Sequence, residues 1–143
     1  MSRTHTTQLT IEFGDCDPAG IVFYPNYFRW MDRATWHYFR ALSLADWRQR
    51  SDGIFGMPLV DAQARFVAPA TYGEDIELDT TIAEWRTKSF VVQHRVRRGE
   101  VLLAEGREVR VFARKHPHDP KRIQAVPPPE DVRAACQDSP NHA

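Results

Sequence analysis

The stretch FGDCDPAGIVFYPNY, residues 13–27, stands between a segment with strand character and a segment with helical character. Before it, apolar residues alternate with polar ones from Gln8 to Phe13, which predicts a half-buried strand that stops at Gly14. After it comes a stripe of apolar residues at helical spacing, formed by Tyr27, Trp30, Met31, Ala34, Tyr38, Ala41 and Leu42. The stretch therefore places a carboxylate, that of Asp17, in a tight loop just ahead of a helix.

The helix is predicted to start at Tyr24 and Pro25. Proline suits the first helical position, and the residue before a proline is disfavoured in the helical conformation, so Tyr24 is the expected cap residue. Because proline has no amide hydrogen, we expect the amides of Tyr24 and of the first turn beyond Pro25 to be free and to face the loop that carries Asp17. They lie at the positive end of the helix dipole, where negative charge is stabilised.

Beyond the helix, four segments show the apolar and polar alternation that is typical of strands, at residues 60–66, 76–85, 90–96 and 101–113. A change of apolar parity near Gly106 indicates a β-bulge, and a short final pairing is expected at residues 123–126. One long helix and about five strands predict an antiparallel α+β domain. We expect this single domain to span residues 1–143, with a weakly docked tail after about residue 127.

The same residues carry a resemblance to a known family. They are Asp17, Gly20 to Val22, Tyr24 to Tyr27, Arg29, Trp30 and Asp32, followed by Trp47 to Gln49, Glu84 to Arg86, Lys88 to Phe90 and Arg110 to Ala113. Over roughly residues 8–126 the chain is similar to the 4-hydroxybenzoyl-CoA thioesterase family, a branch of the hotdog-fold acyl-CoA thioesterases. It departs from the family between Leu44 and Gly56, where Ala45 and Asp46 replace a proline-rich approach.

This resemblance implies a hotdog fold, in which an antiparallel sheet of about five strands wraps around one long helix. Periodicity alone predicts only a sheet with a helix packed on it. Because one helix leaves the edges of such a sheet open, we expect copies of the chain to associate as a homodimer or a homotetramer.

Composition limits the other partners. The 19 basic and 19 acidic residues balance, which argues against a nucleic acid or a membrane surface as the main partner. No apolar run approaches the length of a membrane span, and the N-terminus lacks the apolar core of a signal peptide, so we expect a cytoplasmic protein. In that compartment Cys16 and Cys136 are not expected to form a structural disulfide.

Asp17 can act on a thioester in two ways. Its carboxylate can attack the carbonyl carbon and form a mixed anhydride, or it can activate a water molecule as a general base. In both cases the carbonyl oxygen gains negative charge, and the Tyr24 amide is placed to receive it. The alternative is structural, because an aspartate before Pro18 commonly forms an Asx turn. Asp15 is expected to be a hydrogen bonder of the loop.

Other chemistries fit this sequence less well. Cys16 is a rival nucleophile, but its flanking aspartates disfavour the thiolate, so we interpret it as a small buried residue. Asp15 and Asp17 lack the phosphate-binding loop or further acidic cluster that magnesium needs. His116 and His118 are expected to be polar loop residues. We therefore predict no metal, and no cofactor beyond the CoA of the substrate.

The acyl group is expected to meet Asp32 and Trp47. Helical spacing places Asp32 one turn from aromatic residues on both sides. The resemblance implies that Asp32 and Trp47 hold the hydroxyl end of a hydroxybenzoyl group, and a carboxylate is a suitable acceptor for a phenol hydrogen bond. The alternatives are a solvated ion pair of Asp32 with Arg29 or Arg33, and simple packing for Trp47.

Coenzyme A is expected to contact a turn between two predicted strands. This turn carries Arg86, Lys88 and Ser89, and cations at such a turn can meet phosphates in exposed, salt-sensitive contacts. The family places part of its CoA site at this motif. The alternative is that these cations are solvated or protect a sheet edge.

Together these expectations predict the hydrolysis of an aromatic acyl-CoA, 4-hydroxybenzoyl-CoA, to the free acid and CoA by a carboxylate and a backbone amide. Two alternatives stay open. One is a thioesterase for short-chain or other aliphatic acyl-CoAs. The other is a noncatalytic hotdog subunit that binds an acyl thioester or a protein partner.

Overall fold

A five-stranded antiparallel sheet forms the body of the structure, a computed structural model that describes residues 2–44 and 46–137. In spatial order its strands are β1 (Thr4–Thr10), β4 (Asp75–Trp85), β5 (Phe90–Arg98), β6 (Val101–Arg110) and β3 (Leu59–Phe66). Neighbouring strands pair antiparallel throughout. The strands β1 and β3 therefore form the two edges of the sheet.

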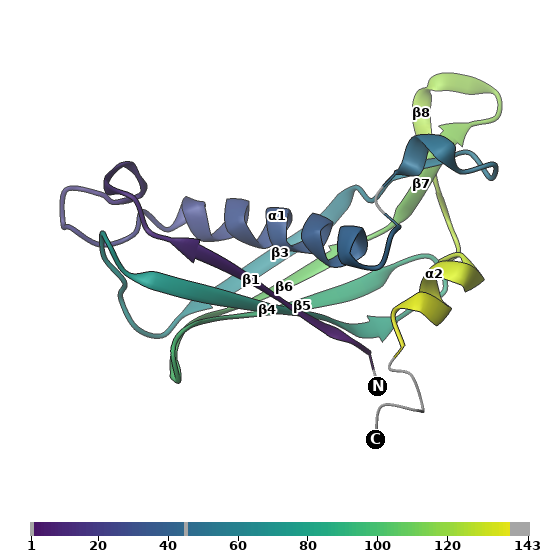
Figure 1. Ribbon diagram of the computed structural model, residues 1–143. Coiled ribbons are helices and arrows are strands. Elements are labelled where there is room, and N and C mark those ends of the chain that lie inside the picture. Colours follow the sequence, from purple (N-terminus) through teal and green to yellow (C-terminus); the bar gives the residue numbers. More distant parts are fainter. Residues whose placement is uncertain (1, 45, 138–143) are drawn as a thin grey trace.

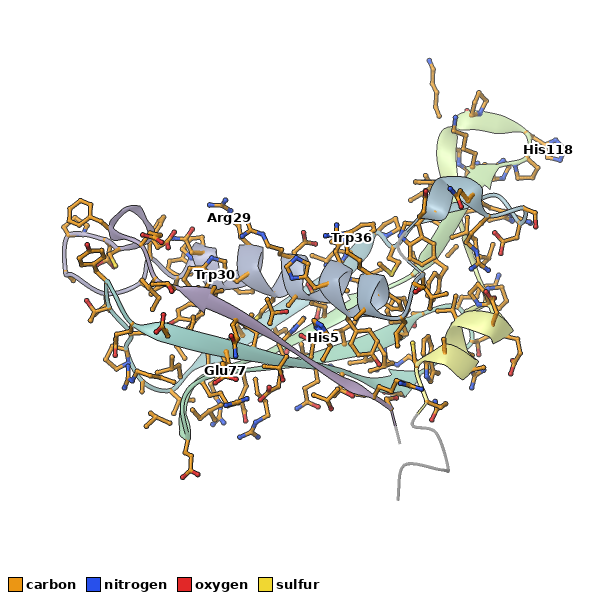
Figure 2. All side chains as sticks on the ribbon, viewed as in Figure 1. His5, Arg29, Trp30, Trp36, Glu77 and His118 are labelled. Atoms are coloured by element: carbon orange, nitrogen blue, oxygen red, sulfur yellow. The ribbon has the colours of Figure 1, made fainter. Side chains whose placement is uncertain are left out.

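The helix α1 (Pro25–Ala41) lies across one face of this sheet (Figure 1). Its buried face consists of Asn26, Tyr27, Trp30, Met31, Ala34, Thr35, Tyr38 and Phe39. Each large apolar side chain buried in this way contributes about 1.5–3 kcal/mol to folding. The opposite face is charged, and Arg29 points away from the sheet (Figure 2). The predicted α+β arrangement, an antiparallel sheet around one long helix, is confirmed, although Ala41 at the end of the predicted stripe is exposed.

A second, smaller sheet lies at the C-terminal end of α1 (Figure 1). It consists of β2 (Ile54–Gly56), β7 (Phe112–His116) and β8 (Asp119–Val126), with β7 in the middle. The predicted run of residues 101–113 is thus two strands, divided at Val111, whose amide donates to the carbonyl of Pro58 at 3.2 Å. The rings of Phe90 and Phe112 stack at 4.7 Å and join the two sheets.

The first strand lies earlier in the chain than predicted. It ends at Thr10, and residues 13–15 form a 3₁₀ turn in which Phe13 is exposed. The carboxylate of Asp15 accepts the amide of Glu12 at 2.8 Å. This local capping bond turns the chain away from the sheet before Phe13, which the alternation of apolar residues does not reveal.

The β-bulge predicted near Gly106 lies a few residues earlier, at residues 102–104, where the pairing of β6 with β5 shifts register. Gly106 itself marks a close contact between helix and sheet. It pairs in register with Ala64 on β3 and with His94 on β5. A Cβ atom at position 106 would collide with the Sδ of Met31 on α1, so only glycine fits without displacement. The apolar parity changes here because the next inward-facing positions are the buried Glu108 and Arg110.

The chain after Pro129 docks against the core, so the prediction of a weakly docked tail is wrong for residues 130–137. They form the short helix α2 (Glu130–Ala135), and Val132 and Cys136, one turn apart, are fully buried. Burial raises the pKa of the Cys136 thiol to about 11. Residues 138–143 of the predicted tail, like Ala45, lie outside the described residues. None of the helices in the described ranges is long and apolar enough to span a membrane.

Candidate active site

Asp17 lies in a tight turn that is closed by hydrogen bonds on both sides. Its carbonyl accepts the amide of Gly20 at 2.9 Å, and its own amide donates to the carbonyl of Ile21 at 2.9 Å. Gly20 has a φ of +82°, a conformation that favours glycine. The Oδ1 of Asp17 accepts the amide of Ala19 at 2.8 Å. The Asx turn that the sequence allows is therefore present, and it fixes the orientation of the carboxylate.

The Asx turn uses only one oxygen of this carboxylate. Within the described part of the chain, Oδ2 of Asp17 accepts no hydrogen bond, and Asp17 lines a pocket of about 400 Å³. The rest of the pocket wall is largely apolar and includes Val22, Tyr24, Tyr27 and residues 66–70. The structural and the chemical use of Asp17 are thus compatible, because one oxygen anchors the side chain and the other stays available.

The first residues of α1 lie at the same pocket. Tyr24 is the N-cap and Pro25 the first helical residue, as predicted. The expectation that Tyr24 avoids the helical conformation is wrong, because its φ and ψ are −55° and −33°. A hydrogen bond of 2.9 Å from the amide of Asn26 to the carbonyl of Phe23 closes a turn over Tyr24 and Pro25, which holds Tyr24 in this conformation.

One amide at this helix start is left for a ligand. The amides of Asn26 and Tyr27 donate to the carbonyls of Phe23 and Tyr24, at 2.9 and 3.1 Å, so the prediction that they are free is wrong. The Tyr24 amide donates to no other group in residues 2–44 or 46–137. It is therefore a hydrogen-bond donor at the wall of the pocket that Asp17 lines, at the positive end of α1.

Asp15 and Cys16 support this loop. The carbonyl of Asp15 accepts the side-chain amide of Asn26 at 2.9 Å and the backbone amide of Phe23 at 2.8 Å. These bonds tie the loop to α1 and confirm Asp15 as a hydrogen bonder of the loop. Cys16 is only partly buried, whereas the sequence predicted a buried residue, and it packs against core residues that include Ile11 and Val22.

Asp32 lies on the outer face of α1 and is paired with a buried arginine from β6. The Nη2 of Arg110 donates to Oδ1 of Asp32 at 2.6 Å. The side chain of Asp32 is 56% exposed, whereas that of Arg110 is 3% exposed. The sequence allowed an ion pair of Asp32 with Arg29 or Arg33 on the same helix, but the partner comes from 78 positions away.

Trp47 is buried beside Trp36, which lies one helical turn after Asp32. The ring centroids of Trp47 and Trp36 are 6.5 Å apart, and Trp47 also packs against Phe39 and Phe112. Packing, the alternative role for Trp47, is therefore real. However, its indole N–H is buried and has no hydrogen-bond partner within the described residues. A buried donor of this kind is costly to leave unpaired.

The turn that carries Arg86, Lys88 and Ser89 lies far from Asp17. The amide of Arg86 donates to the carbonyl of Ser89 at 2.8 Å, and the Lys88 side chain is exposed. In Figure 1 this turn follows the end of β4 opposite to the loop of Asp17. The eleven residues of β4 span about 33 Å at the usual strand rise. One chain therefore does not bring these cations to its own Asp17.

Sequence reasoning missed a group of buried polar side chains behind Asp32. It consists of Thr35, Thr80, His94, Glu108 and Arg110, each at most 3% exposed. The Nε2 of His94 lies 3.0 Å from Oε1 of Glu108, and Nη2 of Arg110 donates to Oε2 of Glu108 at 2.8 Å. The sequence does contain one sign of this group. Glu108 and Arg110 follow Gly106 at every second position of β6, which places them on the same buried face of the strand.

Within this group, Glu108 and Arg110 shift each other's pKa. Burial acts to raise the pKa of the Glu108 carboxyl, but hydrogen bonds from His94 and Arg110 outweigh burial and lower this pKa to about 2. Burial likewise acts to lower the pKa of Arg110, and the adjacent Glu108 and Asp32 outweigh it and raise this pKa. The carboxylate and the guanidinium therefore stabilise one another as ions.

No group of three or more His, Cys, Asp or Glu side chains in the described ranges has the arrangement of a metal site. His116 ends β7 and His118 lies in the turn that follows, with their rings 5.9 Å apart, and Nδ1 of His116 accepts the amide of His118.

The chain has clear relatives among known proteins. The sequence model of the thioesterase-like superfamily matches residues 11–136. The 4-hydroxybenzoyl-CoA thioesterase of Pseudomonas sp. (strain CBS-3) is 46% identical over 143 residues, which cover 95% of this chain and 99% of that protein.

Solved structures agree with the sequence comparison and confirm the predicted hotdog fold. The 4-hydroxybenzoyl-CoA thioesterase from Pseudomonas sp. strain CBS-3 has a TM-score of 0.85 at 44% identity, covering 94% of this chain and 100% of that one. A D17N mutant of 4-hydroxybenzoyl-CoA thioesterase, complexed with 4-hydroxybenzoyl-CoA, has a TM-score of 0.86 at 43% identity, covering 95% and 100%. A gentisyl-coenzyme A thioesterase has a TM-score of 0.76 at 34% identity, covering 92% and 98%. The chain therefore belongs to the 4-hydroxybenzoyl-CoA thioesterase family, within the thioesterase-like superfamily.

Proposed function

We propose that this protein hydrolyses an aromatic acyl-CoA, 4-hydroxybenzoyl-CoA, to the free acid and CoA. The observation that carries the proposal is the pocket shared by Asp17 and the Tyr24 amide, in which a carboxylate oxygen and a backbone N–H are both available beside an apolar wall. Relatives named 4-hydroxybenzoyl-CoA thioesterase and gentisyl-coenzyme A thioesterase support the aromatic assignment.

Asp17 is the residue that we propose to open the thioester, by one of two routes. In the first, its carboxylate attacks the carbonyl carbon, the C–S bond breaks, CoA leaves as the thiolate, and water then hydrolyses the mixed anhydride. In the second, Asp17 takes a proton from a water molecule as that water attacks the carbonyl carbon. The C–S bond then breaks, CoA leaves as the thiolate, and Asp17 returns the proton to the thiolate or to solvent. In both, the Tyr24 amide receives the charge on the carbonyl oxygen, and one such donor is worth about 3 kcal/mol in comparable sites. Neither route uses a metal or a cofactor.

At the other end of the acyl group, we propose that Asp32 and Trp47 hold the ring hydroxyl. A phenol both donates and accepts one hydrogen bond. Asp32 keeps an exposed carboxylate oxygen that Arg110 does not occupy, and Trp47 keeps a buried N–H without a partner in the described structure. An acceptor and a donor of this kind are complementary to a phenol, and an unsubstituted ring would leave both unpaired.

We further propose that a second copy of the chain completes the site. Arg86, Lys88 and Ser89 are suited to the phosphates of CoA, yet a whole strand separates them from Asp17 in one chain. The edge strand β3 carries exposed apolar residues such as Leu59 and Val60, which pairing with another copy would cover. We therefore propose a homodimer or a homotetramer that acts in the cytoplasm, where its two free cysteines would stay reduced.

Purified enzyme tested on a panel of acyl-CoAs should hydrolyse 4-hydroxybenzoyl-CoA with a higher kcat/KM than benzoyl-CoA, and both faster than aliphatic acyl-CoAs. A hydrogen bond to a charged group is worth roughly 1.5–3 kcal/mol, so the ratio of the two aromatic specificity constants should be about tenfold to a hundredfold. A chelator should change none of the rates. Faster turnover of aliphatic acyl-CoAs would favour the alternative thioesterase, and the absence of any hydrolysis would favour a binding subunit.

The exposed cations of the β4–β5 turn should affect the binding of CoA more than the chemical step. Arg86→Ala and Lys88→Ala should each raise KM about fivefold, the equivalent of about 1 kcal/mol, and leave kcat nearly unchanged, since phosphate contacts persist from ground state to transition state. Added salt should raise the wild-type KM in the same way. Lys115→Ala, which removes an exposed cation on β7, is the matched control and should leave KM unchanged. Equal KM values for all four proteins would place the CoA site elsewhere.

A further inference from the structure

Arg110 connects the interior of the protein to Asp32 on its surface. Its guanidinium donates from Nη1 to the carbonyl of Met57 at 2.9 Å, and from Nη2 to Oε2 of Glu108 at 2.8 Å. Its Nε lies 3.3 Å from Oε1 of Glu108. The same Nη2 donates to Oδ1 of Asp32 at 2.6 Å. A planar guanidinium with these partners on several sides has little freedom to turn.

Glu108 is itself held by side chains of β5 and α1. Its Oε1 lies 3.0 Å from Nε2 of His94 on β5, and the hydroxyl of Thr35 on α1 donates to the same oxygen. The Nδ1 of His94 lies 2.8 Å from Oγ1 of Thr80 on β4. Side chains from α1, β4, β5 and β6 therefore form one continuous hydrogen-bonded chain that ends at Asp32.

We infer that Arg110 is a positioning residue for Asp32 and thereby sets the preference of the enzyme for a substrate with a ring hydroxyl. The inference rests on the proposed function, because it assigns to Asp32 the reading of that hydroxyl. Arg110 does not itself touch the substrate. It acts by holding one oxygen of Asp32, so that the other oxygen faces the ligand in a fixed place.

This arrangement matters because Asp32 is otherwise an exposed side chain on a helix surface. Free rotation about its side-chain bonds would spread its carboxylate over several rotamers, and ordering it on substrate binding would cost free energy. The bond from Arg110 orders it in advance. It also occupies Oδ1 with a donor, which leaves an ionised carboxylate that can only accept a hydrogen bond. A phenol supplies the donor that this acceptor needs, whereas an unsubstituted ring does not.

The test measures the ratio of kcat/KM for 4-hydroxybenzoyl-CoA to that for benzoyl-CoA. Arg110→Lys keeps the positive charge but lacks the planar fork, so it cannot hold Asp32, Glu108 and the Met57 carbonyl together. We expect this ratio to fall about tenfold, the equivalent of one weakened charge-assisted hydrogen bond. Arg33→Lys makes the same change at an exposed arginine next to Asp32 in sequence and should leave the ratio unchanged.

A double variant separates positioning from general damage. If Arg110 acts through Asp32, Asp32→Asn lowers the ratio by itself, and adding Arg110→Lys to it lowers the ratio no further. A loss of stability alone would reduce hydrolysis of both substrates equally and leave the ratio intact. An Arg110→Lys enzyme with the wild-type ratio, or a double variant with two additive losses, overturns the inference.

Chemical rescue keeps the inference testable if Arg110→Lys does not fold. Asp32→Ala changes only an exposed side chain and leaves the Nη2 of Arg110 open toward the vacated position. Formate should then bind there and raise the ratio toward the wild-type value, whereas chloride at the same ionic strength should not. No recovery with formate overturns the inference. If the wild-type enzyme prefers neither aromatic substrate, the proposed function is overturned as well. If it prefers 4-hydroxybenzoyl-CoA but formate restores nothing, only the inference about Arg110 is overturned.

Discussion

Replacing Asp17 with Asn should leave a folded protein whose kcat for 4-hydroxybenzoyl-CoA is at least about a hundredfold lower than that of the wild type. Asparagine keeps the size of the side chain, and its carbonyl oxygen can still accept the amide of Ala19, so the Asx turn persists. What disappears is the second carboxylate oxygen, which acts as nucleophile or base in both proposed routes. The measurement is steady-state hydrolysis, with the circular dichroism spectrum and melting temperature of each protein as a test of folding.

Asp119 offers a matched control for this experiment. Like Asp17 it precedes a proline and forms an Asx turn, since its Oδ1 accepts the amide of Lys121 at 3.0 Å. It is the first residue of β8, and it does not line the pocket that contains Asp17. Asp119→Asn should therefore keep wild-type kcat. Comparable activity of Asp17→Asn and Asp119→Asn would mean that Asp17 only shapes its loop.

The parts of this fold that sequence predicts well are those in which burial follows a simple period. Met31, Ala34 and Tyr38 recur at helical spacing because one face of α1 packs on the sheet. Ile76, Leu78 and Ile82 alternate with polar residues because one face of β4 faces that helix. In such segments the pattern is a direct record of which side is buried, so elements and faces are predictable from it.

The pattern fails where the interior is polar or where a local hydrogen bond ends an element. On β6 the inward positions after Gly106 carry Glu108 and Arg110, and charges there resemble an outer face until their partners on α1 and β5 are known. These partners are remote in sequence, and no period reveals them. Phe13 is apolar and yet exposed, because the capping bond between Glu12 and Asp15 ends the strand first.

The candidate site likewise has a part that the sequence predicts, because it is local, and parts that it does not predict, because their partners are remote. Asp17 and the Tyr24 amide are only seven positions apart, and the turn and the helix start that present them are both local features, so the sequence predicts their juxtaposition. The partner of Asp32 is Arg110, 78 positions away, and was not predictable. Arg86, Lys88 and Ser89, which follow β4 and which we propose to bind CoA, belong to a third class, because their proposed place in the site requires a second chain rather than the fold of one.

The buried ions behind Asp32 should make a large contribution to stability, which Glu108→Gln would remove. This variant leaves the buried guanidinium of Arg110 with only Asp32 as a counter-ion, and breaking one partner of a buried pair typically costs about 3–5 kcal/mol. Urea unfolding at pH 7 measures the loss, at one protein concentration because the chain is proposed to associate. Glu105→Gln is the matched control on the same strand, since Glu105 makes a surface pair with Arg65 that is worth at most about 1 kcal/mol.

The difference in unfolding free energy between wild type and Glu108→Gln should also depend on pH. The pKa of Glu108 is about 2 in the folded state, against 4.5 for the unperturbed group. A depressed pKa contributes stability that is complete above pH 4.5 and is lost as the pH falls toward 2, since the unfolded chain then binds the proton first. The shift corresponds to about 3 kcal/mol, of which about 2 kcal/mol should be gone by pH 3. A difference that stays constant from pH 7 to pH 3 would mean that Glu108 is not held as an ion by Arg110 and His94.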